Sequence, residues 1–206
     1  MGKLIKIIIG IIIITLAVFA FIKFYGNKDQ DTQNTQETGV VVVNDVVAGE
    51  VKKLDEENNT FIHKGYGFSL NFPINMTASN FKEGDGEQII FQGDNGSPAG
   101  EWFQMYVSPW DEDEDITVAR IKQDLPEIMI TDPKRVVLGP KQAEGIGPNA
   151  LIFYSQDSGL GDTREIWFIY PEPGRGVYSY LYQVTTYKRL DAMIGKILST
   201  LSFENR

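Results

Sequence analysis

Residues 102–107 read Trp102-Phe103-Gln104-Met105-Tyr106-Val107, a stretch with apolar side chains on both sides of an extended strand. Successive side chains of a strand point to opposite faces of the sheet, so this strand has two faces to bury. Similar β-branched and aromatic runs, separated by Gly, Pro, Asn and Asp, predict a mainly antiparallel sheet. The predicted strands are Phe61 to His63, Gly67 to Phe72, Glu87 to Gln92, Glu101 to Ser108, Lys134 to Leu138, Ala150 to Ser155, Arg164 to Tyr170 and Val177 to Tyr187.

Two segments have helical spacing instead. One follows Asp115, with apolar residues at Val118, Ile121, Leu125 and Ile128, and Pro126 is expected to end or kink it. The second helix is C-terminal, and its apolar stripe consists of Leu190, Met193, Ile194, Ile197, Leu198 and Leu201. Two helices and strands that are apolar on both faces fit a sheet with a helix on each face better than a sandwich of two sheets, so the predicted fold class is α+β.

The two ends of this predicted domain are similar to those of a known family. They are Tyr66-Gly67-Phe68-Ser69-Leu70-Asn71-Phe72-Pro73 and Ile197-Leu198-Ser199-Thr200-Leu201-Ser202-Phe203. Together they resemble PsbP-like domains, a superfamily that includes an extrinsic photosystem II subunit and a nuclear-import factor that binds a small GTPase. The resemblance implies an antiparallel sheet flanked by helices in an α/β/α sandwich, and a non-catalytic domain that binds a larger assembly. It assigns no functional residue, because the matching residues are structural.

The N-terminal stretch Leu4 to Phe24 predicts a membrane anchor. It is apolar without interruption from Ile7 to Ile22. A helix of this length spans roughly 32 Å, which matches a bilayer core of about 30 Å. We therefore predict a single transmembrane helix that acts as a signal anchor, with the lipid bilayer as its partner. A cleaved signal peptide and a buried core helix are the alternatives.

The charges around this span predict its orientation. Lys3 and Lys6 precede it, which favours a cytoplasmic N-terminus and an extracytoplasmic domain of a single-pass cell-membrane protein. The predicted divisions are a transmembrane anchor with a short basic tail at 1–26, a disordered polar and Val-rich linker at 27–58, and a PsbP-like globular domain at 59–206. The valines at 40–43 and 46–47 are either a strand added to an edge of the domain or of a partner, or linker with local β preference.

Composition excludes several classes of chemistry. The net charge is -9, so the basic surface of a nucleic-acid-binding protein is missing. There is no cysteine, which excludes disulfides, thiolate catalysis and cysteine-ligated metals. His63 is the single histidine, and we interpret it as structural. Because phosphate-binding loops and nucleophile elbows are also missing, the sequence predicts a protein that is not an enzyme.

An acidic run that contains Asp111, Asp113 and Asp115 is the strongest ligand-like feature. Closely spaced acids of this kind resemble the first half of a calcium loop. Ile116 stands where the sharp turn of that loop needs glycine, and Lys122 stands where the closing glutamate belongs. Calcium is the one candidate cofactor, and the alternative is a solvated acidic start of a helix.

Tyrosines provide the candidate binding residues. Tyr178, Tyr180 and Tyr182 alternate along one predicted strand, so they project from one face of the sheet. They form either an aromatic platform for a glycan, a peptide or a partner protein, or a set of rings packed beneath a helix. Trp110 is added to these tyrosines as a fourth candidate.

These observations lead to one hypothesis about function and two alternatives. The first is a membrane-anchored, extracytoplasmic, non-enzymatic binding domain whose partner is an envelope or surface protein. One alternative is a structural spacer or adhesion module without a specific ligand. The other is a carboxylate-dependent hydrolase, in which two acids would face each other in a pocket.

Overall fold

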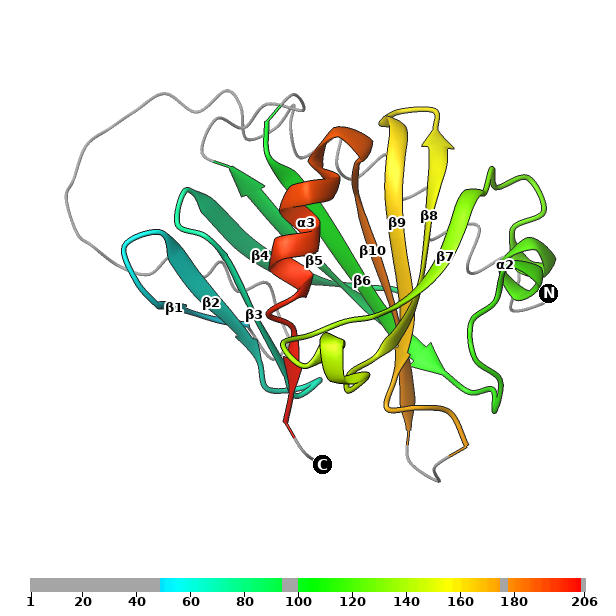
Figure 1. Ribbon diagram of the computed structural model, residues 1–206, viewed down its shortest axis with the longest axis horizontal. Helices are drawn as coiled ribbons and strands as arrows, with labels where there is room; N and C mark the ends of the chain where they lie inside the picture. Colours follow the sequence, from blue (N-terminus) through cyan, green and yellow to red (C-terminus); the bar gives the residue numbers. More distant parts are fainter. Residues whose placement is uncertain (1–48, 94–99, 175–177, 205–206) are drawn as a thin grey trace.

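Two antiparallel sheets build the computed structural model, which describes residues 49–93, 100–174 and 178–204 (Figure 1). The small sheet has the strand order β1-β2-β3-β11, and the large sheet has the order β4-β5-β6-β10-β9-β8-β7. The strands of the small sheet are β1 Glu50–Lys53, β2 Asn58–His63, β3 Phe68–Pro73 and β11 Ser202–Phe203. Those of the large sheet are β4 Met76–Glu83, β5 Gly86–Gly93, β6 Trp102–Trp110, β7 Thr131–Val137, β8 Asn149–Asp157, β9 Gly161–Tyr170 and β10 Ser179–Tyr187. The helical elements are α2 Val118–Asp124, α3 Asp191–Leu198 and the short 3-10 turns η1 Gln142–Glu144 and η2 Lys188–Leu190.

Tight turns join neighbouring strands of both sheets. The turn between β2 and β3 closes with a hydrogen bond from the N–H of Gly67 to the carbonyl of His63 at 2.8 Å. Gly67 has a φ of 68°, and Gly84 in the turn between β4 and β5 has a φ of 60°. Glycine adopts this backbone conformation without the clash that a Cβ atom would cause. Strands β2 and β3 therefore form a hairpin around Tyr66.

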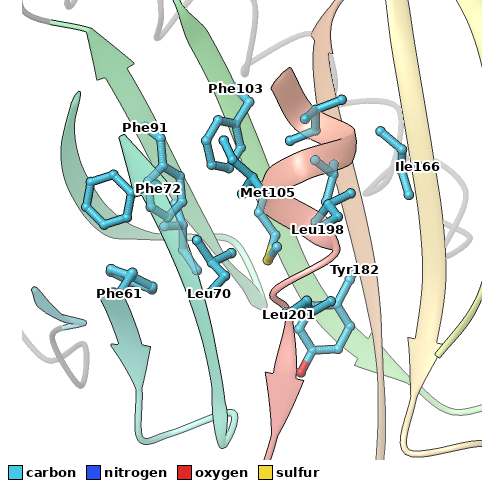
Figure 2. Close-up of a cluster of buried hydrophobic side chains, with 14 of the residues drawn as sticks. Phe61, Leu70, Phe72, Phe91, Phe103, Met105, Ile166, Tyr182, Leu198 and Leu201 are labelled. Carbon is cyan, nitrogen blue, oxygen red and sulfur yellow. The ribbon is translucent and has the colours of Figure 1, made fainter. Parts of the chain in front are cut away.

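The main hydrophobic core lies between the two sheets. Phe91 of β5 meets Phe61 of β2 and Phe72 of β3, with ring centroids 5.2 Å and 5.1 Å apart. It also stacks on Phe103 of β6 at 4.3 Å. Figure 2 shows these four rings in the space between the sheets. The apolar stripe of α3 closes this core with Ile194, Ile197 and Leu198, followed by Leu201.

Helix α2 covers part of the opposite face of the large sheet. The hydroxyl of its N-cap residue, Thr117, accepts a hydrogen bond from the N–H of Arg120 at 3.1 Å. The helix ends at the C-cap Leu125, directly before Pro126, as the sequence predicts. The buried residues of this second cluster are Ile116, Ile121, Leu151, Phe153, Trp167, Ile169 and Leu181.

The predicted α+β fold class, with its helix-flanked α/β/α sandwich, is wrong. The described chain is mostly β-sheet, and its two α-helices have only seven and eight residues. Helices of this length cannot cover both faces of a seven-stranded sheet, so a second sheet covers much of one face. The apolar face of a sheet must pack against another element. The alternation of apolar and polar residues along its strands does not specify whether that element is a helix or a second sheet.

No helix in the described part of the chain is long and apolar enough to cross a membrane. The predicted span Leu4 to Phe24, with its signal-anchor role and its lipid partner, lies outside the described residues. The prediction of a single-pass cell-membrane protein, with a cytoplasmic N-terminus and an extracytoplasmic domain, is therefore corrected: the residues that the structure describes do not support it.

Strand β1 lies within the range 27–58 that the sequence predicts as linker. It pairs with β2 from Glu50 opposite Ile62 to Lys53 opposite Asn59. Gly49, directly before it, lies so close to the ring of Phe61 that an added Cβ atom would stand 2.1 Å from two ring carbons. The folded domain therefore includes residues 49–58.

Candidate functional site

The side chain of Arg120 organises the connection between β6 and α2. Its guanidinium forms two hydrogen bonds to Glu112, Nε to Oε2 at 2.8 Å and Nη2 to Oε1 at 2.6 Å, and it also pairs with Asp124. It lies 5.5 Å from the ring centroid of Trp110, whose Nε1–H donates to the backbone oxygen of Glu114 at 3.0 Å. The candidate residue Trp110 is thus used within the fold, on the face of the sheet that carries α2.

The candidate calcium ligands do not come together. Asp115 pairs with Arg135, with Nη1 and Oδ2 2.9 Å apart. Within residues 49–93, 100–174 and 178–204, no three acidic, histidine or cysteine side chains are arranged to hold a metal ion. The arrangement favours a role for the acidic run in ion pairs around α2.

The three candidate tyrosines differ in exposure. Tyr178 is 92% exposed, Tyr180 is half-buried, and Tyr182 is fully buried. The ring of Tyr182 stacks on Phe168 of β9, with centroids 4.8 Å apart. Tyr180 and Tyr182 belong to the core between the sheets, whereas Trp110 packs on the opposite face. The structure does not bring Trp110 together with the tyrosines.

A different set of aromatic residues gathers at one end of the molecule. Tyr66 and Tyr180 meet edge to face at 5.0 Å, and Tyr170 stacks on Phe203 at 3.8 Å. In Figure 1 the turn between β2 and β3, strand β11 and the C-terminal end of β9 all lie at the lower end. The exposed Tyr178 precedes β10 at this same end. We call Tyr66, Tyr170, Tyr178, Tyr180 and Phe203 the tyrosine end.

A buried hydrogen-bond network fixes the position of Tyr66. Its backbone N–H donates to Nδ1 of His63 at 3.1 Å, so the proton of the neutral imidazole is on Nε2. This Nε2–H donates to Oε1 of Glu87 at 2.9 Å, and the side-chain amide of Asn80 donates to the same oxygen. Burial raises the pKa of the Tyr66 phenol, with nearby Glu87 as a second cause. The phenol therefore stays a neutral hydroxyl near pH 7.

No sequence pattern identifies Tyr66, Tyr170 and Phe203 together as members of this end. The residues come from a turn and two strands that are distant in the chain, and only the packing of the two sheets brings them together. One signal was present in the sequence. The strand that ends at Tyr170 is followed by the strand that contains Tyr180, and a hairpin places such residues side by side, as the observed pairing of Tyr170 with Tyr180 does.

Glu165 of β9 is a buried acid beneath the α2 side of the large sheet. Its carboxyl accepts hydrogen bonds from the hydroxyls of Thr163 at 2.8 Å and Thr185 at 2.7 Å, and from Nε1 of Trp167 at 3.2 Å. Burial raises the pKa of Glu165, and the three hydrogen bonds offset only part of that effect. Folding therefore favours the protonated form of this side chain.

Glu165→Gln is expected to stabilise the protein at neutral pH. Because the pKa of Glu165 is higher in the folded protein, protonation of this side chain stabilises the fold. This stabilisation is fully present below the pKa of the unfolded chain, near 4.5, and is lost as the pH rises through the pKa of the folded protein. Glutamine resembles the protonated acid and cannot lose that proton, so the variant should not show this loss. Urea denaturation of both proteins between about pH 4 and about pH 8 measures the difference. A difference in unfolding free energy that does not grow with pH would contradict the raised pKa.

No family model and no curated protein matches this chain. Among solved structures it is similar to a protein from Bacteroides thetaiotaomicron VPI-5482, with a TM-score of 0.40 and 15% sequence identity. The match covers 71% of this chain and 48% of that chain, so this chain spans about half the length of that protein. A likeness at this level assigns neither fold nor function. The resemblance to PsbP-like domains stays a prediction.

Proposed function

We propose that this chain is a non-catalytic binding domain that docks a partner protein against the tyrosine end. The observation that supports this most directly is the side chain of Tyr178, which is 92% exposed two residues before the half-buried Tyr180. Burial of one large apolar side chain contributes roughly 1.5–3 kcal/mol, so an exposed ring beside others offers binding energy to a partner. Tyrosine is also enriched among the residues that dominate binding at protein interfaces.

Four of the five rings of the tyrosine end are held by contacts within the fold, and Tyr178 is the exposed exception. Phe203 and Tyr170 stack on each other, and Phe203 also contacts the buried Tyr182 at 5.6 Å. Tyr66 is fixed by its contacts with His63 and Tyr180. Binding to a preorganised surface loses little side-chain entropy, which is otherwise about 0.5–1.5 kcal/mol for each flexible side chain that is immobilised.

The side chains of the tyrosine end favour protein contact over catalysis. The five residues present ring faces and phenol hydroxyls but no acid, base or amide. Proton transfer needs a positioned group whose pKa lies near the working pH, and a neutral phenol with a raised pKa does not meet this requirement. Rigid amphipathic rings with hydroxyl groups at their edges are typical of protein interfaces.

A photo-crosslinking amino acid at position 178 is expected to form a discrete adduct with a partner in cells. The matched control carries the same group at Met129, which is 51% exposed but lies between α2 and β7. Tyr178→Ala should weaken binding of the captured partner by about tenfold or more, whereas Tyr178→Phe should retain most of it. Equal adducts from both positions would contradict the proposal. An adduct that resists protease but is cleaved by glycosidases would identify a glycan instead.

A further inference from the structure

Strand β4 ends the large sheet, and none of the described residues provides a strand for its outer edge. A two-residue turn joins β4 to β5, with Glu83 opposite Gly86. The two residues that flank such a turn form a hydrogen-bonded pair, and hydrogen-bonded and non-hydrogen-bonded pairs alternate along the two strands from that point. In a non-hydrogen-bonded pair, the backbone N–H and C=O groups point away from the neighbouring strand. The backbone N–H and C=O groups that point away from β5 are therefore those of Met76, Ala78, Asn80 and Lys82.

Three of these four residues are shielded from solvent. The exposed fraction is 2% for Met76, 7% for Ala78 and 5% for Asn80. Buried backbone N–H and C=O groups almost always have a hydrogen-bond partner, and an unpaired one costs about 1–3 kcal/mol. Within the described part of the chain, no backbone group bonds to the outward groups of these residues. The outward backbone groups of this edge therefore need hydrogen-bond partners other than the described backbone, and an added strand would supply them all together.

The chain enters the described domain beside this edge. The N–H of Gly49 donates to Oδ1 of Asn80 at 3.3 Å, and the ring of Phe61 packs against Gly49 from the other side. Val47 precedes Gly49 by two residues, so it lies within about 7 Å of it. The eight residues 40–47 reach about 26 Å when extended, and β4 also has eight residues.

We propose that residues 40–47, Val40-Val41-Val42-Val43-Asn44-Asp45-Val46-Val47, add as a strand to the outer edge of β4. Valine is among the residues most favoured in strands. The edge itself has few of the features that block pairing with other chains: it has no proline, and its charges lie only at its end, at Lys82 and Glu83. A segment that is tethered next to the edge covers it without a second molecule. This inference does not depend on the role of the tyrosine end.

Amide hydrogen exchange in the full-length chain tests this pairing. Alternate residues of an added strand point their N–H groups at β4, so one of Val42→Pro and Val43→Pro must remove a bond to it. In that variant, the amide hydrogens of Ala78 and Asn80 should exchange at least about tenfold faster than in the wild-type chain. The amides of Thr77 and Ser79 bond to β5 and should stay protected, which shows that the domain remains folded. Thr35→Pro, in the polar stretch before the valines, is the matched control and should change none of them.

Three results would overturn the proposal. The first is rapid exchange of the Ala78 and Asn80 amides in the wild-type chain, which would mean an open edge. The second is protection that both proline variants leave unchanged and that falls on dilution, which would identify a second copy of the chain as the occupant. The third is protection that depends on neither proline nor concentration, which would place another part of the chain there.

Discussion

Phe91→Ala is expected to lower the free energy of unfolding by about 3–5 kcal/mol, the usual cost of removing a buried phenylalanine from a packed core. Phe91 is fully buried, and its ring contacts Phe61 and Phe72 of the small sheet and Phe103 of the large sheet. Alanine would leave a cavity where both sheets meet, and strands fixed by their own ladders cannot collapse to fill it. Urea denaturation followed by tryptophan fluorescence measures the loss.

Tyr178→Ala is the matched control for this experiment. It removes a ring of similar size from a side chain that is 92% exposed, so stability should change by no more than about 0.5 kcal/mol. If Phe91→Ala also costs less than about 1 kcal/mol, the two sheets do not share the core described above. A stable Tyr178→Ala protein also ensures that any loss of partner binding in that variant reflects the surface alone.

The strands of this fold could largely be predicted from the sequence, because β-branched and aromatic runs between turn residues signal them. Each predicted strand is present, as β2, β3 and β5 to β10. Strand β4 was not predicted. Its inward-facing positions include the polar Asn80, and this residue breaks the alternation of apolar and polar side chains that marks a strand. Asn80 is tolerated inside because it donates to Glu87, a partner that no local pattern could reveal.

The partner of the large sheet could not be predicted in the same way. The small sheet combines strands from the start of the domain with β11 at its end, where Ser202 pairs with Ser69. This contact spans more than half of the chain, and local periodicity contains no information about it. The helical stripe at the C-terminus was predicted correctly, yet the helix itself is only eight residues long and covers one part of the core.

The candidate site was only partly accessible to sequence reasoning for the same reason. Alternation correctly places Tyr180 and Tyr182 on one face, but it does not reveal that β2, β3 and β11 cover that face and bury Tyr182. Exposure depends on what packs above a strand, and Tyr178, directly before the first residue of β10, is 92% exposed. The additional rings of Tyr66 and Phe203 are placed by tertiary packing.

His63→Phe is expected to lower the free energy of unfolding by about 1–3 kcal/mol, because it removes the hydrogen bond from Nε2 of His63 to the buried carboxyl of Glu87. Nε2 of His63 lies 2.9 Å from Oε1 of Glu87, and both side chains are buried between the sheets. Phenylalanine keeps a ring that can stack on Tyr66 and Phe68, so the loss reports mainly on the polar contacts. Urea denaturation provides the measurement.

The double variant His63→Phe/Glu87→Gln tests whether the loss comes from this contact. Glutamine replaces the carboxyl group but keeps an oxygen that can accept the hydrogen bond from Asn80. Replacement of His63 should therefore cost at least about 1 kcal/mol less when residue 87 is already glutamine than in the wild-type chain. Equal costs in the two backgrounds would mean that His63 and Glu87 are not coupled. Tyr66 would then be held by ring stacking and its turn alone, because the histidine would no longer link the tyrosine end to the large sheet.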